Sequence, residues 1–133
     1  MIVLDSHVLL WSQFQQNKLG KKTLALIERR WHQGEVAVPA IAFWEIGMLT
    51  ERGRFRLKIP LAEWRQQLLS AGLKEIALNG EIAMRALDFA LLPADPADRF
   101  IAATALVNHA TLLTADEKLL AWHHGLLRQD ART

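Results

Sequence analysis

The chain contains no cysteine, which excludes a disulfide framework, a thiolate zinc site and a cysteine nucleophile. It also lacks any apolar run near the roughly 18 residues that a membrane-spanning helix needs. The N-terminal MIVLD begins directly on a strand-like pattern, without a basic segment or a small-residue cleavage site. We therefore expect a cytoplasmic protein that does not enter the membrane.

Common catalytic motifs are missing as well. The sequence has no HExxH spacing, no GxSxG, no Walker loop and no GxGxxG, which excludes the usual acyl-transfer, nucleotide and dinucleotide sites. The five histidines match no metal-ligand spacing, so we expect them on the surface or in the core. The five tryptophans fall mostly on expected helix faces, where core packing is the default.

Short apolar stretches alternate with longer helical patterns along the 133 residues, and 51% of the residues are apolar, enough for a single domain over 1–133. Strands are expected at 2–4, 35–38, 73–78, 111–114 and 126–127. Helices are expected at 6–12, 20–33, 39–52 with Pro39 as first residue, 60–72, 80–91, 96–109 and 115–122. This alternation predicts an α/β fold with an open, mainly parallel sheet and helices on both faces.

Four carboxylates stand at the edges of apolar segments, where acidic side chains are seldom found unless they are paired or bind a metal. Glu45 lies on the same expected helix face as Ile41 and Leu49. Two of the others follow apolar strands, at the carboxyl ends where open α/β sheets collect their ligands. The sequence therefore predicts one divalent-cation site formed by Asp5, Glu45, Asp98 and Asp116.

Two of these acids have simpler explanations that the sequence leaves open. Asp5 could be the N-cap of the helix that follows it, because aspartate is among the best capping residues. Glu45 could lie at the rim of the core and pair with Arg52 or another basic residue.

Helix capping competes with metal binding at Asp98, and a capping pattern also surrounds Asp116. Asp95 fits the N-cap of the helix that begins at residue 96, and Asp98 then occupies the third position, where the helix dipole favours an anion. Thr114 and Glu117 have the spacing of a capping box, with Thr114 as the cap. That arrangement leaves Asp116 without a capping role.

The charge balance indicates an anionic partner. If four acids surround a cation, the other ten acidic residues face 16 lysines and arginines, an excess of six positive charges. The alternative is a slightly basic surface with evenly scattered charge. Directly after the Glu45 helix, a segment alternates basic residues with small or apolar ones, and it either grips phosphates or forms an exposed edge hairpin. Its candidate nucleic-acid contacts are Arg52, Arg54, Arg56 and Lys58.

Four blocks of sequence follow one another along the chain: VLDSHVLLW at 3–11, FWEI at 43–46, DPADRFIAATA at 95–105 and LLTAD at 112–116. In this order they resemble the signature blocks of PIN-domain ribonucleases, and most closely those of the VapC-type toxins. The resemblance extends over essentially the whole chain. Relatives often have a serine three positions before the helical glutamate, where this chain has Ala42.

The resemblance implies a three-layer α/β/α sandwich with strand order 3-2-1-4-5. It implies a ribonuclease that uses Mg²⁺ or Mn²⁺, held by Asp5, Glu45, Asp98 and Asp116, with Ser6 and Thr114 as supporting hydroxyls. A homodimer and a cognate antitoxin that masks the acidic groove are implied as well. The hydrolysis of RNA phosphodiester bonds by the toxin of a type II toxin–antitoxin pair is thus the expected function.

Two other functions remain open from the sequence. A non-catalytic, RNA-binding or adaptor version of the fold would bind RNA equally well with and without Mg²⁺. A phosphatase or phosphotransfer domain needs an aspartate nucleophile in a motif such as DxD, whereas this chain has Asp5, Ser6 and His7.

Overall fold

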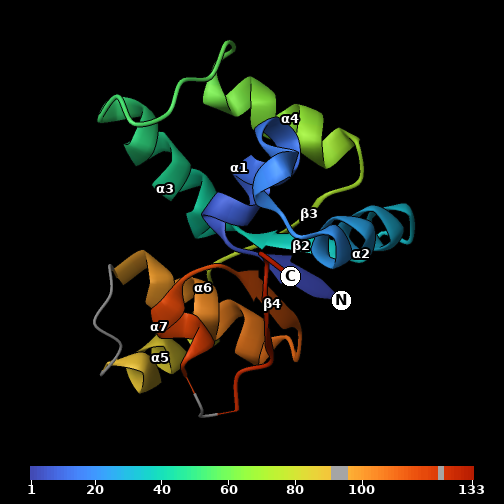
Figure 1. The fold of residues 1–133 in the computed structure, drawn as a ribbon. Helices are drawn as coiled ribbons and strands as arrows, with labels where there is room; N and C mark the ends of the chain where they lie inside the picture. Colours follow the sequence, from blue (N-terminus) through green and yellow to red (C-terminus); the bar gives the residue numbers. More distant parts are fainter. Residues whose placement is uncertain (91–95, 123–124) are drawn as a thin grey trace.

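A single parallel sheet forms the centre of the molecule (Figure 1). The structure, a computed structural model, describes residues 1–90, 96–122 and 125–133. Its strands are β1 (Ile2–Leu4), β2 (Val36–Pro39), β3 (Lys74–Ile76), β4 (Thr111–Thr114) and β5 (Arg128–Asp130). Their spatial order is β3-β2-β1-β4-β5, and every neighbouring pair is parallel. The predicted order 3-2-1-4-5 is confirmed.

The three central strands β2, β1 and β4 are buried on both faces, because helices cover both faces of the sheet. Ile2 and Leu4 of β1 belong to one buried cluster, and Val3 between them belongs to the other. In β4, Leu113 belongs to the first of these clusters and Leu112 to the second. This alternation follows from the two-residue period of a strand and explains why these strands are continuous apolar runs.

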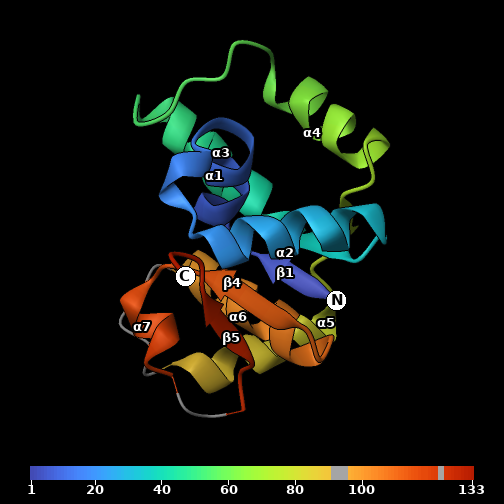
Figure 2. The ribbon, with the colours of Figure 1, turned by 45° about the vertical axis from the view of Figure 1, so that its right-hand side comes forward.

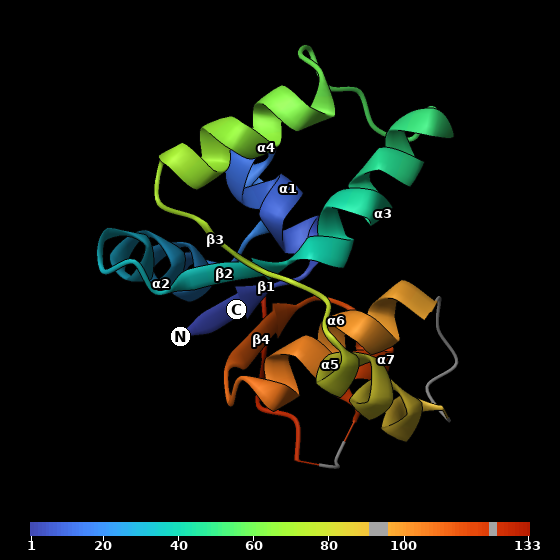
Figure 3. The same ribbon diagram turned by 180° about the vertical axis from the view of Figure 1, so that it is seen from behind.

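Two layers of helices enclose the sheet, as Figures 1 and 3 show from opposite sides. One face carries α1 (Ser6–Phe14), α2 (Lys21–His32), α3 (Ala40–Glu51) and α4 (Leu61–Ser70). The other carries α5 (Gly80–Arg85), α6 (Pro96–Val107) and α7 (Glu117–Leu120), with 3-10 turns η2 (Ala86–Phe89) here and η1 (Gln16–Lys18) after α1. The expected α/β/α sandwich is confirmed. No helix in the described ranges is long and apolar enough to cross a bilayer.

Several expected boundaries were wrong. Pro39 is the last residue of β2 and the N-cap of α3, because its φ of −65° suits extended backbone as well as a first helical turn. The last strand is not 126–127 but the polar Arg128–Asp130, which pairs with β4 at the sheet edge and therefore needs less apolar surface. The expected helix at 80–91 tightens into η2 after Arg85. The helix expected from residue 115 begins only at Glu117.

The C-terminal segment packs closely against the start of α2 (Figure 2). The Gly20 amide donates a hydrogen bond to the Ala131 carbonyl at 2.9 Å, and the Lys22 amide donates to Thr133 at 3.2 Å. A Cβ atom at Gly20 would lie 2.0 Å from the carbonyl carbon of Thr133, so only glycine allows this approach. This contact holds β5 at the edge of the sheet beside the end of β4.

Candidate functional site

All four predicted carboxylates line one cavity at the carboxyl edge of the sheet. The cavity has a volume of about 280 Å³. The carboxylates reach it from different elements: the residue after β1, the middle of α3, the first turn of α6 and the residue before α7. The described residues that line it are Asp5, Ser6, His7, Trp11, Glu45, Asp98, Ala115 and Asp116.

Asp5 is both a helix cap and a member of this cavity. Its Oδ1 accepts a hydrogen bond from the Val8 amide at 2.9 Å, which caps α1 as the simpler explanation expected. Its Oδ2 accepts a hydrogen bond from the Thr114 hydroxyl on the neighbouring strand. Capping therefore uses one carboxylate oxygen and does not exclude a second role for Asp5.

Burial raises the pKa of Asp5 above its usual value of 3.8, because the charged carboxylate loses hydration. The hydrogen bonds from Thr114 and Val8 lower this pKa, as does nearby His7, whereas the negative charge of Glu45 raises it further. A cation in the cavity would oppose both the burial and the repulsion. The electrostatics at Asp5 therefore favour a bound positive charge.

Glu45 reaches the cavity from α3 and is held there by a hydroxyl. The Ser6 hydroxyl donates a hydrogen bond to Oε1 of Glu45. Ala42, on the same helix, is fully buried and has no hydroxyl, and the hydroxyl next to Glu45 comes from Ser6 on α1. The expected alternative, an ion pair between Glu45 and Arg52, does not form within the described residues.

Asp98 is the third residue of α6, which begins at Pro96 as the sequence predicted. It is partly buried and lines the cavity. The position in the first helical turn lets the helix dipole stabilise its negative charge. The predicted N-cap, Asp95, lies outside the described residues.

The predicted capping box at Thr114 and Glu117 was wrong. Asp116 is the N-cap of α7 and accepts hydrogen bonds from the Lys118 amide at 2.8 Å and the Leu119 amide at 3.2 Å. Thr114 is still part of β4, too early to cap α7, and its hydroxyl faces β1. That hydroxyl donates to Asp5 and accepts from the Asp116 amide at 3.1 Å, so one side chain links both acids.

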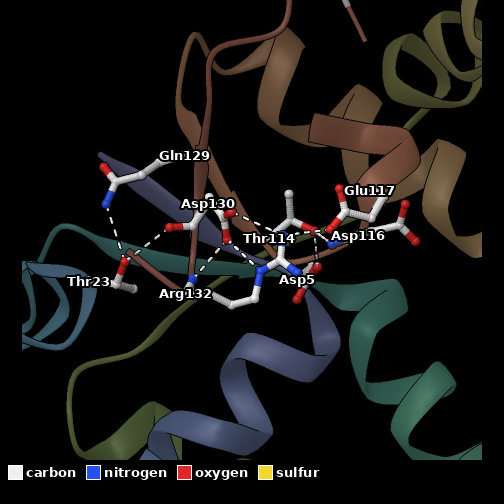
Figure 4. Close-up of polar contacts among 8 residues, drawn as sticks. All are labelled: Asp5, Thr23, Thr114, Asp116, Glu117, Gln129, Asp130 and Arg132. Atoms are coloured by element: carbon white, nitrogen blue, oxygen red, sulfur yellow. Dashed lines mark hydrogen bonds and ion pairs between the residues drawn. The ribbon is translucent and has the colours of Figure 1, made fainter. Parts of the chain in front are cut away.

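A second polar cluster, which the sequence did not reveal, lies beside this one (Figure 4). The Arg132 guanidinium donates hydrogen bonds to Asp130 at the end of β5 and to Glu117 in the first turn of α7. These bonds lower the pKa of Asp130. The cluster ties α7, and with it Asp116, to the edge strand. The one signal for it in the sequence is an acidic residue, Asp130, at the carboxyl end of the last strand.

The donor set of the cavity fits a hard divalent cation. All four acids offer oxygen, the ligand that Mg²⁺ and Mn²⁺ prefer. As they stand, no three histidine, aspartate or glutamate side chains in the described residues are close enough together to hold a metal ion. Mg²⁺ usually keeps several waters and takes substrate phosphate as a further ligand, so carboxylates too far apart to contact one ion together could hold it partly through those waters.

The basic residues after α3 separate into two groups. Arg52 and Arg54 line a larger cavity of about 450 Å³, which shares His7, Trp11 and Glu45 with the carboxylate cavity. Arg56 lines a different hollow. Lys58 is exposed on the loop that joins α3 to α4, and this loop replaces the edge hairpin considered from the sequence.

Comparison with known proteins finds a matching family model, a related sequence and several solved structures with the same fold. The PIN domain model matches residues 2–122. The ribonuclease VapC22 of Mycobacterium tuberculosis is 35% identical over 124 residues, 92% of each chain. Among solved structures, the VapBC2 complex of Rickettsia felis bound to promoter DNA has a TM-score of 0.71 at 16% identity, covering 97% of this chain and 98% of that one. The VapBC-1 structure of nontypeable Haemophilus influenzae has a TM-score of 0.65 at 18% identity over all of both chains.

These likenesses extend over nearly the full length of the chain and include the blocks that carry all four acids. The solved structures share the fold at low sequence identity. With the family model and the VapC22 relative, they lead to one conclusion: the chain belongs to the PIN domain family.

Proposed function

We propose that this protein is a divalent-metal-dependent endoribonuclease that hydrolyses RNA phosphodiester bonds, and that it is the toxin of a type II toxin–antitoxin pair. One observation supports the proposal above others: four carboxylates from four separate elements line one cavity at the carboxyl edge of the sheet. Their convergence is hard to explain by capping, since capping involves only Asp5 and Asp116.

Each side chain has a proposed role in the reaction. Asp5, Glu45 and Asp98 are the principal ligands of Mg²⁺ or Mn²⁺, and Asp116 holds a second cation or orients a water. Ser6 and Thr114 donate hydrogen bonds to Glu45 and Asp5, which fixes the direction of these carboxylates. The bound cation supplies a more acidic water and neutralises charge on the phosphoryl and leaving oxygens.

RNA is the proposed substrate for two reasons: basic residues border the carboxylate cavity, and a related protein is a ribonuclease. Arg52 and Arg54 border the carboxylate cavity through shared lining residues. Fixed cations on this side would attract phosphates to the acidic cavity, which repels them without metal. The M. tuberculosis relative is a ribonuclease.

The proposal includes two protein partners. A cognate antitoxin is supported by relatives described as toxin–antitoxin or VapBC complexes. The second proposed partner is another copy of this chain, with which it forms a homodimer. Co-expression with the product of a small adjacent reading frame, followed by light scattering, tests both: a stable complex with no nuclease activity is expected. A monomer that never binds the adjacent product would contradict them.

The catalytic proposal is tested with purified protein and an unstructured RNA in Mg²⁺, Mn²⁺ or EDTA. Cleavage is expected with either ion and not in excess EDTA. Asp98→Asn should lose most activity, whereas Asp88→Asn should not, because Asp88 lies in η2 and pairs at the surface with Arg85. Full cleavage in EDTA would disprove metal dependence.

The same assay separates the two other functions. An adaptor would bind the RNA equally with and without Mg²⁺ and leave it intact. A phosphatase or phosphotransfer domain would act on a phosphomonoester, such as p-nitrophenyl phosphate, in preference to RNA. The four acids in one cavity favour the nuclease over both.

A further inference from the structure

The larger cavity next to the carboxylates is lined by both aromatic and basic side chains. Its volume of about 450 Å³ lies within the range of roughly 300–1,000 Å³ that is usual for ligand pockets. Aromatic rings of α1 and α3 and cations from η1 and the end of α3 both line it. Figures 1 and 3 show α1 and α3 next to each other on this face of the sheet.

We propose that this cavity is a stacking subsite for one unpaired base of the RNA substrate, with Trp44 as the main stacking platform. The inference rests on the proposed ribonuclease function and extends it to a substrate-binding residue. It concerns the nucleotide next to the phosphate that is cleaved, because the two cavities share His7, Trp11 and Glu45.

Trp44 is the first reason for the proposal. It is 56% exposed, although the sequence predicted core packing for the tryptophans, and its neighbour Phe43 is buried. Trp64, in contrast, is only 5% exposed. Trp44 and Glu45 both line this cavity, so an exposed aromatic side chain and a candidate metal ligand border the same space.

The opposite wall is already arranged around an aromatic ring. Trp11 meets the His7 ring edge-to-face, with a centroid distance of 6.4 Å, and the Lys18 ammonium lies 5.8 Å from the centroid of the Trp11 ring. Both neighbours restrict the orientation of Trp11. A base that enters between α1 and α3 therefore meets an aromatic surface from each helix.

The charges of the lining match a nucleic acid. Lys18, Arg52 and Arg54 supply three cations, against the single carboxylate of Glu45. Aromatic platforms in a groove of positive charge are the usual way in which proteins hold single strands, with bases stacked and phosphates paired. The two cavities are continuous, so one RNA strand could place a base in the larger cavity and the adjoining phosphate in the carboxylate cavity. This continuity favours RNA over a peptide as the occupant.

The test compares RNA cleavage and binding by Trp44→Ala, Trp44→Phe and a control. The substrate is an unstructured RNA oligonucleotide with one cleavage site, and a second version is abasic at the nucleotide on one or the other side of that site. Met84→Ala is the matched control, because Met84 is an exposed apolar side chain on α5, away from both cavities.

Trp44→Ala should weaken binding of the intact RNA by roughly 5- to 150-fold, the usual value of one stacked base. Trp44→Phe should recover much of the loss because it keeps an aromatic face, and Met84→Ala should bind like the wild type. For one of the two abasic RNAs, wild type and Trp44→Ala should bind equally weakly. Melting temperatures of the variants show that each is folded.

Three results would overturn the inference. Equal losses on intact and abasic RNA would mean that Trp44 does not stack on a base. Wild-type binding by Trp44→Ala, with lost affinity for the co-expressed partner protein, would identify the cavity as a peptide site. RNA cleavage that is unaffected by every Trp44 variant would reject the subsite while the nuclease proposal stands. No cleavage by the wild type, in contrast, would reject the nuclease proposal itself.

Discussion

The hydroxyl of Thr114, at the end of β4, donates a hydrogen bond to Oδ2 of Asp5, which follows β1. The parallel register of the two strands, with Leu4 opposite Leu113, brings these residues together from 109 positions apart. The same hydroxyl accepts a hydrogen bond from the Asp116 amide. One buried side chain therefore orients two candidate metal ligands, and the predictions below follow from this arrangement.

Replacement of Thr114 by valine should impair both the site and the fold. Valine has a similar shape but leaves a buried oxygen of Asp5 and the Asp116 amide without their partner, at a cost of about 1–3 kcal/mol. Metal affinity or activity should fall about 10- to 100-fold, as for other residues that orient ligands. Thr114→Ser, which keeps the hydroxyl, is the control. Urea unfolding and initial cleavage rates measure both effects, and full activity in the valine variant would show that the hydroxyl orients nothing.

Asp5→Asn should inactivate the enzyme yet stabilise the metal-free protein at neutral pH. Burial raises the folded-state pKa of Asp5, so between pH 3.8 and that raised pKa the folded state binds more protons than the unfolded state. Stability of the wild type therefore falls as the pH rises through this window, and asparagine, which caps about as well, avoids the loss.

Thermal unfolding in EDTA from pH 3 to 8 measures this difference. The advantage of Asp5→Asn should be present at pH 7 and disappear below about pH 4, where the wild-type carboxyl is protonated in both states. Added Mg²⁺ should raise the melting temperature of the wild type more than that of the variant. A variant less stable than the wild type at every pH would mean that the carboxylate is well accommodated without a cation.

Asp116 combines a cap with a candidate ligand, and two substitutions separate these roles. Asparagine caps about as well as aspartate, so Asp116→Asn should keep the stability and lose activity. Asp116→Ala should lose activity and also about 1 kcal/mol of stability. Chemical unfolding beside cleavage rates distinguishes the two. If Asp116→Asn cleaves normally, Asp116 is only a cap.

The basic residues after α3 should differ in their contribution to RNA binding. Arg52 and Arg54 line the cavity next to the carboxylates, whereas Arg56 and Lys58 do not. Neutralising the first pair should reduce the slope of log K against log salt by about 0.7 per lost phosphate contact on single strands. Binding titrations from low to high salt measure the slope. An equal reduction from Arg56→Gln with Lys58→Gln would assign the contacts to the whole loop.

The sequence by itself determined the fold class. The strands at 2–4, 36–39 and 111–114 are apolar on both faces, and helices with one apolar face separate them, a combination that only a parallel sheet covered on both sides accommodates. The four acids were also visible, because each lies within or at the edge of an apolar segment. Local patterns of this kind depend on neighbours a few residues apart, and the sequence displays them directly.

The tertiary structure decided which oxygen contacts which partner. Thr114 has the spacing of a cap, but the register of β4 against β1 directs its hydroxyl to Asp5 and leaves the capping of α7 to Asp116. The hydroxyl next to Glu45 comes from Ser6, a residue 39 positions away. Exposure of Trp44 was equally invisible, because the packing of α1 against α3 determines which faces remain open. These features depend on contacts between distant elements, which only the folded chain specifies.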